Sequence, residues 1–455
     1  MSSSLRGLVV GLLMLVTAIA FEAQAVTTAM PAAAADLAGV ALYAWAFTAF
    51  SIAQILAIVI AGRLCDRSGP VPPLVGGLAL FGAGLVIAAL APAMPVLLVG
   101  RFVQGLGGGS VNLALMVTVG KVFDPADQAR VMTWFSAAWM LPSFIGPAAA
   151  GWLTETLSWH AVFWGIVPFV LLGAAFLFPA LRRTPIPLHR EEDGPAPVGL
   201  GAAVLVSVGI TLLQVAGQQL TWLSAVLAAA GLGLLVVGMP RLMPAGYGPL
   251  APGMAAVINV RLLTGGAFMA GESFLPLMLV QLRGLSLVQA GMVVTIASVG
   301  WVVGSWVQAR PWLRLRRDEI ITLGAACVAA GMALIAAGSW WPSLWLGVVV
   351  GGATIAGAGM GLQTASTSLA VMLLSEPAQL GRNTSSLQVG EAIGMSLLGA
   401  VAGTLFAFFH GLGLDVPAFG APMSVLVVVI VAAVVVSRRV GPVQNHTAQQ
   451  LLPDP

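Results

Sequence analysis

The feature that most constrains this chain is a succession of long apolar runs. Fourteen segments of about 20 mostly apolar residues follow one another along the 455 residues, and short clusters of charged residues separate them. A helix needs about 20 apolar residues to cross the hydrocarbon core of a bilayer. Only 8% of the residues are charged, against about 25% in soluble domains. The chain is therefore predicted to be an all-α membrane protein, and a soluble fold is excluded.

The predicted spans define where the chain crosses the membrane and where it is interrupted. They lie at 7–30, 40–62, 72–92, 95–120, 130–154, 160–181, 198–217, 220–240, 254–281, 287–309, 319–339, 343–373, 384–410 and 422–437. The longest polar stretch, from Arg182 to Pro197, is expected to be a linker after the sixth span. A second break, from Pro240 to Pro252, follows the eighth span.

The basic residues predict the orientation, because Lys and Arg in short loops favour the cytoplasmic side. With a cytoplasmic N-terminus, 17 of the 19 basic residues lie inside, only Arg283 lies outside, and Arg101 falls within the fourth span. The 17 are Arg6, Arg63, Arg67, Lys121, Arg130, Arg182, Arg183, Arg190, Arg241, Arg261, Arg310, Arg314, Arg316, Arg317, Arg382, Arg438 and Arg439. This bias predicts an even number of spans with both termini cytoplasmic. Because these charges are scattered, no nucleic-acid partner is expected.

An internal repeat relates the two ends of the chain. Six residues recur at an offset of 252: Gly105, Gly107, Gly109, Arg130, Ala150 and Gly151 correspond to Gly357, Gly359, Gly361, Arg382, Ala402 and Gly403. A fixed offset without gaps is the mark of a duplicated unit. We expect two six-helix halves, residues 1–182 and 254–440. The linker and two inserted helices would occupy 183–253, and a cytoplasmic tail 441–455.

A short motif follows the second span. Residues 62–69 read GRLCDRSG and resemble the loop signature G-x-L-x-D-R-x-G of the major facilitator superfamily. The resemblance implies a conformational latch formed by Gly62, Asp66, Arg67 and Gly69, with Asp66 facing the start of the thirteenth span near 382–386. The sequence departs from the signature at 70–73, where Pro70 to Pro73 replace the basic residues that usually follow.

A second motif lies in the fifth span. Pro142, Gly146, Pro147 and Gly151, within LPSFIGPAAAGW, resemble the antiporter signature G-P-x-x-G-G, with Ala150 in place of one glycine. The resemblance is to the 14-span drug:proton antiporters of the superfamily, and it covers nearly the whole chain. It implies export and the major facilitator fold, which has two six-helix halves and here two inserted helices.

Four charged side chains inside spans are the candidates for proton and substrate coupling: Glu22, Glu272, Glu391 and Arg101. Ionisable residues within a membrane are costly and mark functional sites by default. Glu22 and Glu272 lie 250 residues apart, close to the repeat offset of 252, so both are expected to face a central cavity. Two alternatives stay open. Each glutamate could simply be hydrogen-bonded between helices, and Arg101 could extend to the outer interface.

Three residues are candidates for lining the substrate cavity. Gln104 belongs to the sequence RFVQG at 101–105, which resembles the buried-arginine motif of the family. Gln24 lies two residues after Glu22, in FEAQAVTTAMP, where the family places an acid and a proline. Trp139 could contact flat apolar drugs, although tryptophans in membrane proteins are common at the interfaces.

The predicted function is proton-coupled efflux of amphipathic or cationic drugs by alternating access. The chain is expected to act as a monomer in a bacterial cytoplasmic membrane, with a small molecule, protons and lipid as partners. No enzyme activity, cofactor or metal is expected, because the histidines are isolated and no phosphate-binding loop occurs. Two alternatives remain: export of one dedicated metabolite or lipid by the same fold, and a non-transporting membrane receptor or scaffold.

Overall fold

The computed structural model describes residues 3–123, 125–183, 199–217, 222–244, 246–310, 312–376 and 379–443. Within these ranges the regular elements are helices, as the apolar runs predict. The first eight are α1 (Ser3–Asp36), α2 (Trp45–Ser68), α3 (Val71–Ala89), α4 (Met94–Val122), α5 (Pro125–Thr156), α6 (Trp159–Arg183), α7 (Leu200–Ala216) and α8 (Trp222–Leu242). A 3-10 turn, η1 (Val40–Leu42), precedes α2.

The remaining six helices form the C-terminal part of the bundle. They are α9 (Met254–Arg283), α10 (Leu287–Gln308), α11 (Arg317–Trp340), α12 (Leu346–Leu374), α13 (Leu380–Gly411) and α14 (Asp415–Ser437). Each of the fourteen predicted segments therefore coincides with a helix. Among the described residues, twelve helices are long and apolar enough to cross a membrane. The 17-residue α7 is apolar but shorter, and α5 is not among the twelve.

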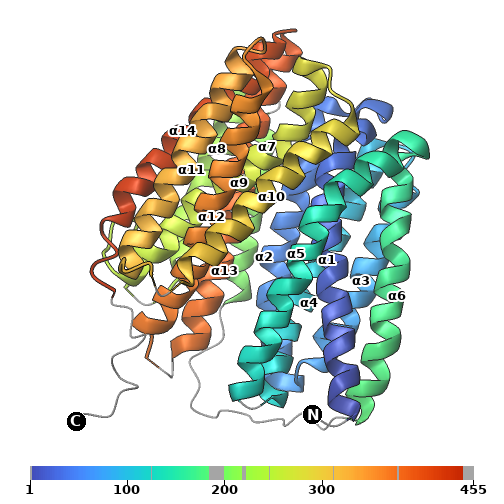
Figure 1. Cartoon of the computed structure of the whole chain (residues 1–455), viewed down its shortest axis with the longest axis vertical. Coiled ribbons are helices and arrows are strands. Elements are labelled where there is room, and N and C mark those ends of the chain that lie inside the picture. Colours follow the sequence, from blue (N-terminus) through green and yellow to red (C-terminus); the bar gives the residue numbers. More distant parts are fainter. Residues whose placement is uncertain are drawn as a thin grey trace.

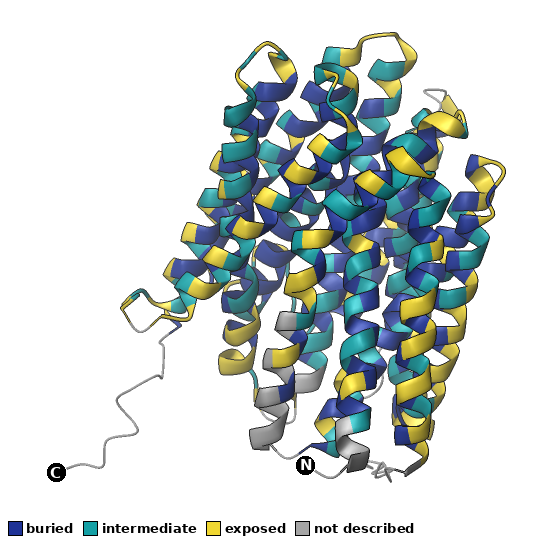
Figure 2. Cartoon of the chain, turned by 45° about the vertical axis from the view of Figure 1, so that its right-hand side comes forward, coloured by how far each residue is buried: buried dark blue, intermediate teal, exposed yellow. Residues whose placement is uncertain are grey.

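Apolar side chains cover the outside of the bundle. Figure 2 shows the exposed residues along the outward faces of the helices. On α14, the residues Val428, Val431 and Val435 are each more than half exposed and recur at the spacing of one helix face. Apolar stripes on the outside of a helical bundle fit contact with lipid tails, and a helix pairs its own backbone groups, as a membrane span requires.

Helices α1–α6 and α9–α14 form two groups that lie side by side in Figure 1. We call them the N-terminal group (α1–α6) and the C-terminal group (α9–α14). We call the end at which α1 begins the proximal end, and the end at which α1 finishes and α2 begins the distal end. The two groups meet mainly where α5 packs against α10 and α2 packs against α13.

The repeated glycines occupy corresponding places in the two groups. A Cβ at Gly105 or Gly109 would collide with the backbone of α2, and one at Gly107 with α3. A Cβ at Gly357 or Gly361 would likewise collide with α10, and one at Gly359 with α11. Small residues let membrane helices approach backbone to backbone. The offset of 252 residues therefore corresponds to the same helix packing twice.

Helices α7 and α8, the pair predicted to be inserted, pack across the junction of the groups. The hydroxyl of Ser207 on α7 donates to the carbonyl of Ile52 on α2 at 3.5 Å. A Cβ at Gly217, which ends α7, would collide with the side chain of Thr404 on α13. Helices α7 and α8 cross closely at Gly209 and Gly231. The pair therefore contacts both groups.

Candidate functional site

A buried ion pair forms the centre of the N-terminal group. Arg101 on α4 donates to the carboxylate of Glu22 on α1, and also to the side chain of Gln104 at 3.1 Å. Its Nε donates to the carbonyl of Ala46 at 2.9 Å, and its guanidinium lies 4.6 Å from the ring centre of Phe50. The side chains of Arg101 and Glu22 are only 4% and 1% exposed. Arg101 therefore points into the bundle and not to the interface.

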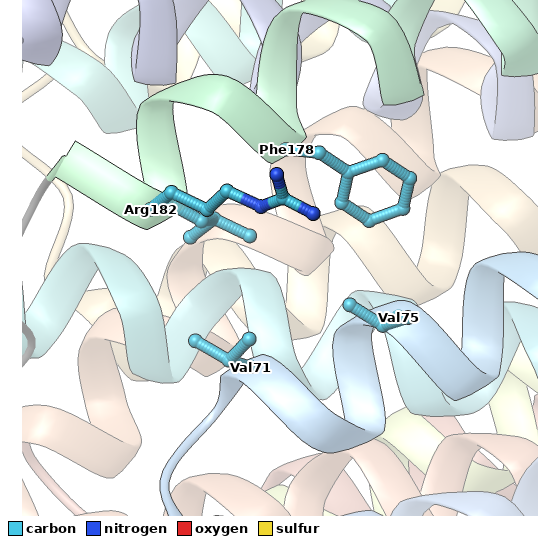
Figure 3. Close-up of a pocket in the computed structure, with 5 residues that line it drawn as sticks. Val71, Val75, Phe178 and Arg182 are labelled. Atoms are coloured by element: carbon cyan, nitrogen blue, oxygen red, sulfur yellow. The ribbon is translucent and has the colours of Figure 1, made fainter.

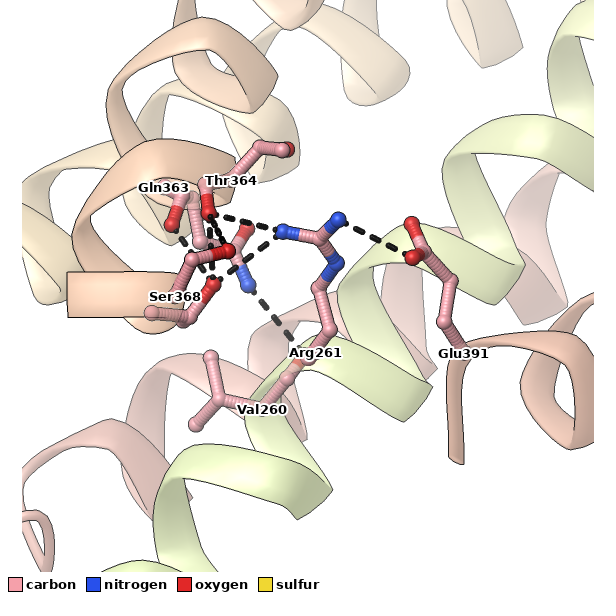
Figure 4. Close-up of polar contacts among 7 residues, drawn as sticks. Val260, Arg261, Gln363, Thr364, Ser368 and Glu391 are labelled. Atoms are coloured by element: carbon pink, nitrogen blue, oxygen red, sulfur yellow. Dashed lines mark hydrogen bonds and ion pairs between the residues drawn. The ribbon is translucent and has the colours of Figure 1, made fainter. Parts of the chain in front are cut away.

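A second ion pair lies in the C-terminal group, between α9 and α13. Figure 4 shows Arg261 between Glu391 and α12. The Nη2 of Arg261 lies 2.9 Å from a carboxylate oxygen of Glu391, and its Nη1 donates to the carbonyl of Thr364 at 2.9 Å and to the hydroxyl of Thr367 at 3.1 Å. The side chains of Arg261 and Glu391 are 10% and 23% exposed. This pair is less enclosed than the first.

Sequence reasoning missed the role of Arg261, because it counted this residue among the loop cations. The structure places Arg261 two turns inside α9, where its backbone neighbour Val260 accepts a hydrogen bond from Gln363 at 3.2 Å. The sequence did contain a signal for its place inside the bundle, because Arg261 lies seven residues after the start of the predicted span at 254. A cation at that depth needs a partner inside the bundle.

Glu272 is the third candidate acid, and it differs from the other two. It lies past the middle of α9 and is half-buried. Among the described residues, it makes no hydrogen bond or ion pair, whereas Glu22 and Glu391 each contact an arginine. One turn later, Pro276 lacks the N–H that would bond the carbonyl of Glu272. The turn that carries this acid therefore lacks one helical hydrogen bond, the one that would end at the carbonyl of Glu272.

The three acids are not in one cluster. Arg261 and Glu272 are eleven residues apart on α9, which corresponds to about 16 Å along a helix. The Arg261–Glu391 pair lies near the proximal end of its group, whereas Glu272 lies toward the distal end. The structure brings Glu22, Arg101 and Gln104 together, and it leaves Glu272 and Glu391 in separate places.

The antiporter-type motif of α5 lies where the two groups meet. A Cβ at Gly146 would lie 3.3 Å from the Cβ of Gln24 on α1. The carbonyl of Pro147 approaches Gly291 of α10, and Gly151 approaches the carbonyl of Leu287, so that a Cβ at either glycine would collide with backbone. Pro142 is buried earlier in the same helix. The motif therefore permits a close crossing with α1 and with the other group.

The three predicted cavity residues lie in different surroundings. Gln104 is fully buried within the Glu22 and Arg101 cluster. Gln24 lies half-buried at the crossing of α1 and α5. Trp139 on α5 is 42% exposed. The structure does not bring these three side chains together.

The predicted latch occupies the proximal end of α2. Gly62 lies within the helix, Asp66 and Arg67 are exposed in its last turn, and Gly69 ends it with a φ of 81°, a conformation that favours glycine. The predicted partner region at the start of α13 contacts the end of α8. There, Ser386 donates to the carbonyl of Leu242 at 3.1 Å. The role of the latch stays a prediction.

A surface pocket between α3 and α6 is separate from all of these groups. Figure 3 shows Val71 and Val75 on one side of it, and Phe178 and Arg182 on the other. None of the candidate acids lines it. We therefore do not assign the transport site to this pocket.

Comparison with known proteins now identifies the fold. The sequence profile of the Major Facilitator Superfamily matches residues 11–354. The chain belongs to the major facilitator superfamily. A solved transporter of the POT family, in complex with 5-aminolevulinic acid, superimposes with a TM-score of 0.71 over 96% of this chain and 97% of that one, at 15% identity. At that identity, the likeness shows the fold alone.

Several relatives carry names that refer to drug efflux or export. The chain is 27% identical to the multidrug transporter protein MdtP of Bacillus subtilis, over 87% of this chain and 74% of that protein. It is 30% identical to the cephamycin export protein CmcT of Amycolatopsis lactamdurans, over 85% and 82%. An uncharacterized MFS-type transporter of Mycobacterium tuberculosis is 28% identical, and the match spans 57% of its length.

These findings confirm the superfamily and the resemblance to multidrug efflux transporters. The protein is a multi-pass membrane transporter and not an enzyme. Its substrate, its coupling ion and the roles of its site residues belong to the proposal below.

Proposed function

We propose that the protein is a proton-coupled exporter of amphipathic, cationic compounds. The observation that carries this proposal is the Glu272 carboxylate, which lies half-buried inside a membrane helix and, among the described residues, makes no hydrogen bond or ion pair. An unpaired carboxylate in apolar surroundings is disfavoured as an anion. It is stabilised either by a proton or by a cation that comes close to it.

Exchange follows from this choice of partner. A carboxylate that holds a proton cannot at the same time form an ion pair with a cationic compound. Each departure of the compound on one side of the membrane therefore leaves Glu272 free to take a proton there, and proton release on the other side prepares it for the next compound. Glu22 and Glu391 are held by Arg101 and Arg261 in this state, and we assign them supporting roles in the same cycle.

Alternating access requires that the two groups move relative to each other around the site. In the proposed arrangement all fourteen helices cross the membrane, with residues 1–182 and 254–440 as the two halves and 183–253 as linker and inserted pair. Both termini face the cytoplasm of a bacterial inner membrane. The distal end then faces outward, and the exporter acts as a monomer.

The direction of transport is supported by the α5 motif and by the relatives. The motif lies at the crossing of α5 with α10, where a change in helix packing alters the contact between the groups. Relatives named for multidrug transport, multidrug resistance and multidrug efflux each match more than four-fifths of the chain. Export of a broad set of compounds is the function that agrees with both.

The test uses vesicles that carry the purified protein and a proton gradient. The wild type is expected to move a cationic dye when the gradient is applied, and Glu272→Gln is expected to abolish gradient-driven movement, because glutamine cannot exchange a proton. Glu376→Gln is the matched control, since Glu376 is exposed at the proximal end of α12. Normal coupled transport by Glu272→Gln would refute the assignment. A wild type that moves none of a panel of cationic dyes would refute the substrate class.

A further inference from the structure

Tyr43 forms a polar contact between the two groups at the distal end. It precedes α2 and is fully buried. Its hydroxyl donates to the backbone carbonyl of Ser273 on α9, at 2.6 Å. A buried tyrosine usually finds a partner for its hydroxyl. Here, the partner belongs to the other group of helices, so the bond exists only while the distal ends of the groups are together.

Aromatic rings from the C-terminal group surround the ring of Tyr43. The ring centre of Phe274 on α9 lies 5.3 Å away, and that of Phe406 on α13 lies 6.5 Å away. On its own side, Phe47 of α2 lies at 5.4 Å. Ring pairs at these spacings attract one another. The ring therefore packs into the closed junction, while the hydroxyl supplies the directional contact.

The acceptor lies in the turn that carries the unpaired acid. Ser273 directly follows Glu272, and Pro276 is in the same turn of α9. Because proline lacks an N–H, the carbonyl of Glu272 has no helical donor, and the backbone ladder is interrupted here. The contact from Tyr43 therefore reaches α9 one residue after the carbonyl that lacks its helical donor.

Other contacts between the groups lie at the same end. The carboxylate of Glu155 on α5 accepts a hydrogen bond from the backbone N–H of Val288 on α10 at 3.0 Å. A Cβ at Gly403 on α13 would collide with the side chain of Ala44, next to Tyr43. The bond from Tyr43 is thus one part of a closed distal junction, and it is the part adjacent to Glu272.

We propose that Tyr43 is the positioning residue of this distal closure. Its hydroxyl fixes the Glu272 turn of α9 against the N-terminal group, and the distal end opens when this bond breaks. The link to transport rests on the exchange proposed at Glu272, whereas the closure itself does not. Opening of the distal end therefore requires a contact to break in the turn of α9 that carries Glu272, and not in a remote part of the bundle.

The experiment measures the distance between the distal ends in purified protein without substrate and without a proton gradient. Spin labels are attached at Leu157→Cys and Trp345→Cys, two distal positions that are 71% and 77% exposed and belong to different groups. Cys65 and Cys327 are first replaced by alanine. In Tyr43→Phe, which keeps the ring and removes only the hydroxyl, the ratio of long to short distances is expected to rise about two- to tenfold, as the loss of one buried hydrogen bond predicts.

The chain contains only two tyrosines, so the second supplies the matched control. The hydroxyl of Tyr247 bonds Asn259 at the proximal end of α9, and Tyr247→Phe is expected to leave the distal distances unchanged. Unchanged distances in Tyr43→Phe would overturn the proposal. A lower melting temperature of the variant without a change in the distances would overturn it as well. Because no dye or gradient is used, this outcome is independent of whether the proposed exchange is correct.

Discussion

Both groups of helices bury an arginine against a glutamate, but they enclose the pair to different degrees. In the N-terminal group, the side chains of Glu22 and Arg101 are 1% and 4% exposed. In the C-terminal group, those of Glu391 and Arg261 are 23% and 10% exposed. Arg101 also donates to Gln104 and to the carbonyl of Ala46, and Arg261 also donates to two groups on α12. The second lies at the edge of a polar interface whose bonding is incomplete.

The incomplete bonding is visible in individual atoms. Among the described residues, the buried Nε of Arg261, the side-chain carbonyl oxygen of Gln363 and the hydroxyl of Thr364 have no hydrogen-bond partner. Buried polar atoms in proteins are nearly always paired. The two pairs therefore differ in their surroundings: the N-terminal pair is enclosed, whereas the C-terminal pair lies beside several buried polar atoms that have no partner among the described residues.

The largest expected effect comes from removing each arginine. Arg101→Leu leaves the enclosed carboxylate of Glu22 without its cationic partner, and removing one partner of a buried pair costs about 3–5 kcal/mol. Arg261→Leu is expected to cost less than half of that, because solvent reaches Glu391. Thermal unfolding of the two purified variants measures the difference. Equal losses of stability would contradict the contrast between the pairs.

The next effect concerns two buried glutamines, one on α4 and one on α12. The side chain of Gln104 accepts a hydrogen bond from Arg101, and Gln104→Leu is expected to cost about 1–3 kcal/mol because an enclosed charged donor loses its acceptor. Gln363 donates one bond to the carbonyl of Val260 and has an unpaired oxygen, so Gln363→Leu is expected to cost about 1 kcal/mol or less. A larger loss in Gln363→Leu would show that its oxygen has a partner after all.

The helices were predictable from the sequence because about 20 apolar residues are a length requirement of the membrane and not of any partner. The repeat was predictable for a related reason: glycines such as Gly105 and Gly357 are needed wherever two backbones approach within about a side-chain width. An apolar run and a set of closely spaced glycines can each be recognised within one segment of the sequence. The structure has the helices and the close helix contacts at the expected positions.

The pairing inside the bundle was not predictable in the same way. Glu22 and Arg101 are 79 residues apart, and nothing in either segment specifies the other. Arg261 was assigned to a loop because counting charges does not register depth within a helix. The acceptor of Tyr43 is a backbone carbonyl, which every residue possesses, so only the packing of the segment before α2 against α9 selects Ser273. The position of Glu272 within its helix was expected, but that it has no partner among the described residues is a property of the fold.

The smallest effect on stability is expected at two buried threonine hydroxyls, those of Thr28 on α1 and Thr364 on α12. Neither hydroxyl has a partner among the described residues, and together they give the sharpest test of the comparison between the groups. Valine has nearly the same shape, and removing an unpaired hydroxyl relieves a cost, so each Thr→Val variant is expected to change the free energy of unfolding by less than about 1 kcal/mol. The two variants are expected to differ in the rate of dye transport. If the C-terminal interface receives a mobile polar partner during the cycle, then Thr364→Val lowers the rate of dye movement several-fold while Thr28→Val does not. Equal rates in the two variants, measured in the same vesicles, would assign the unpaired atoms around Arg261 to packing and not to transport.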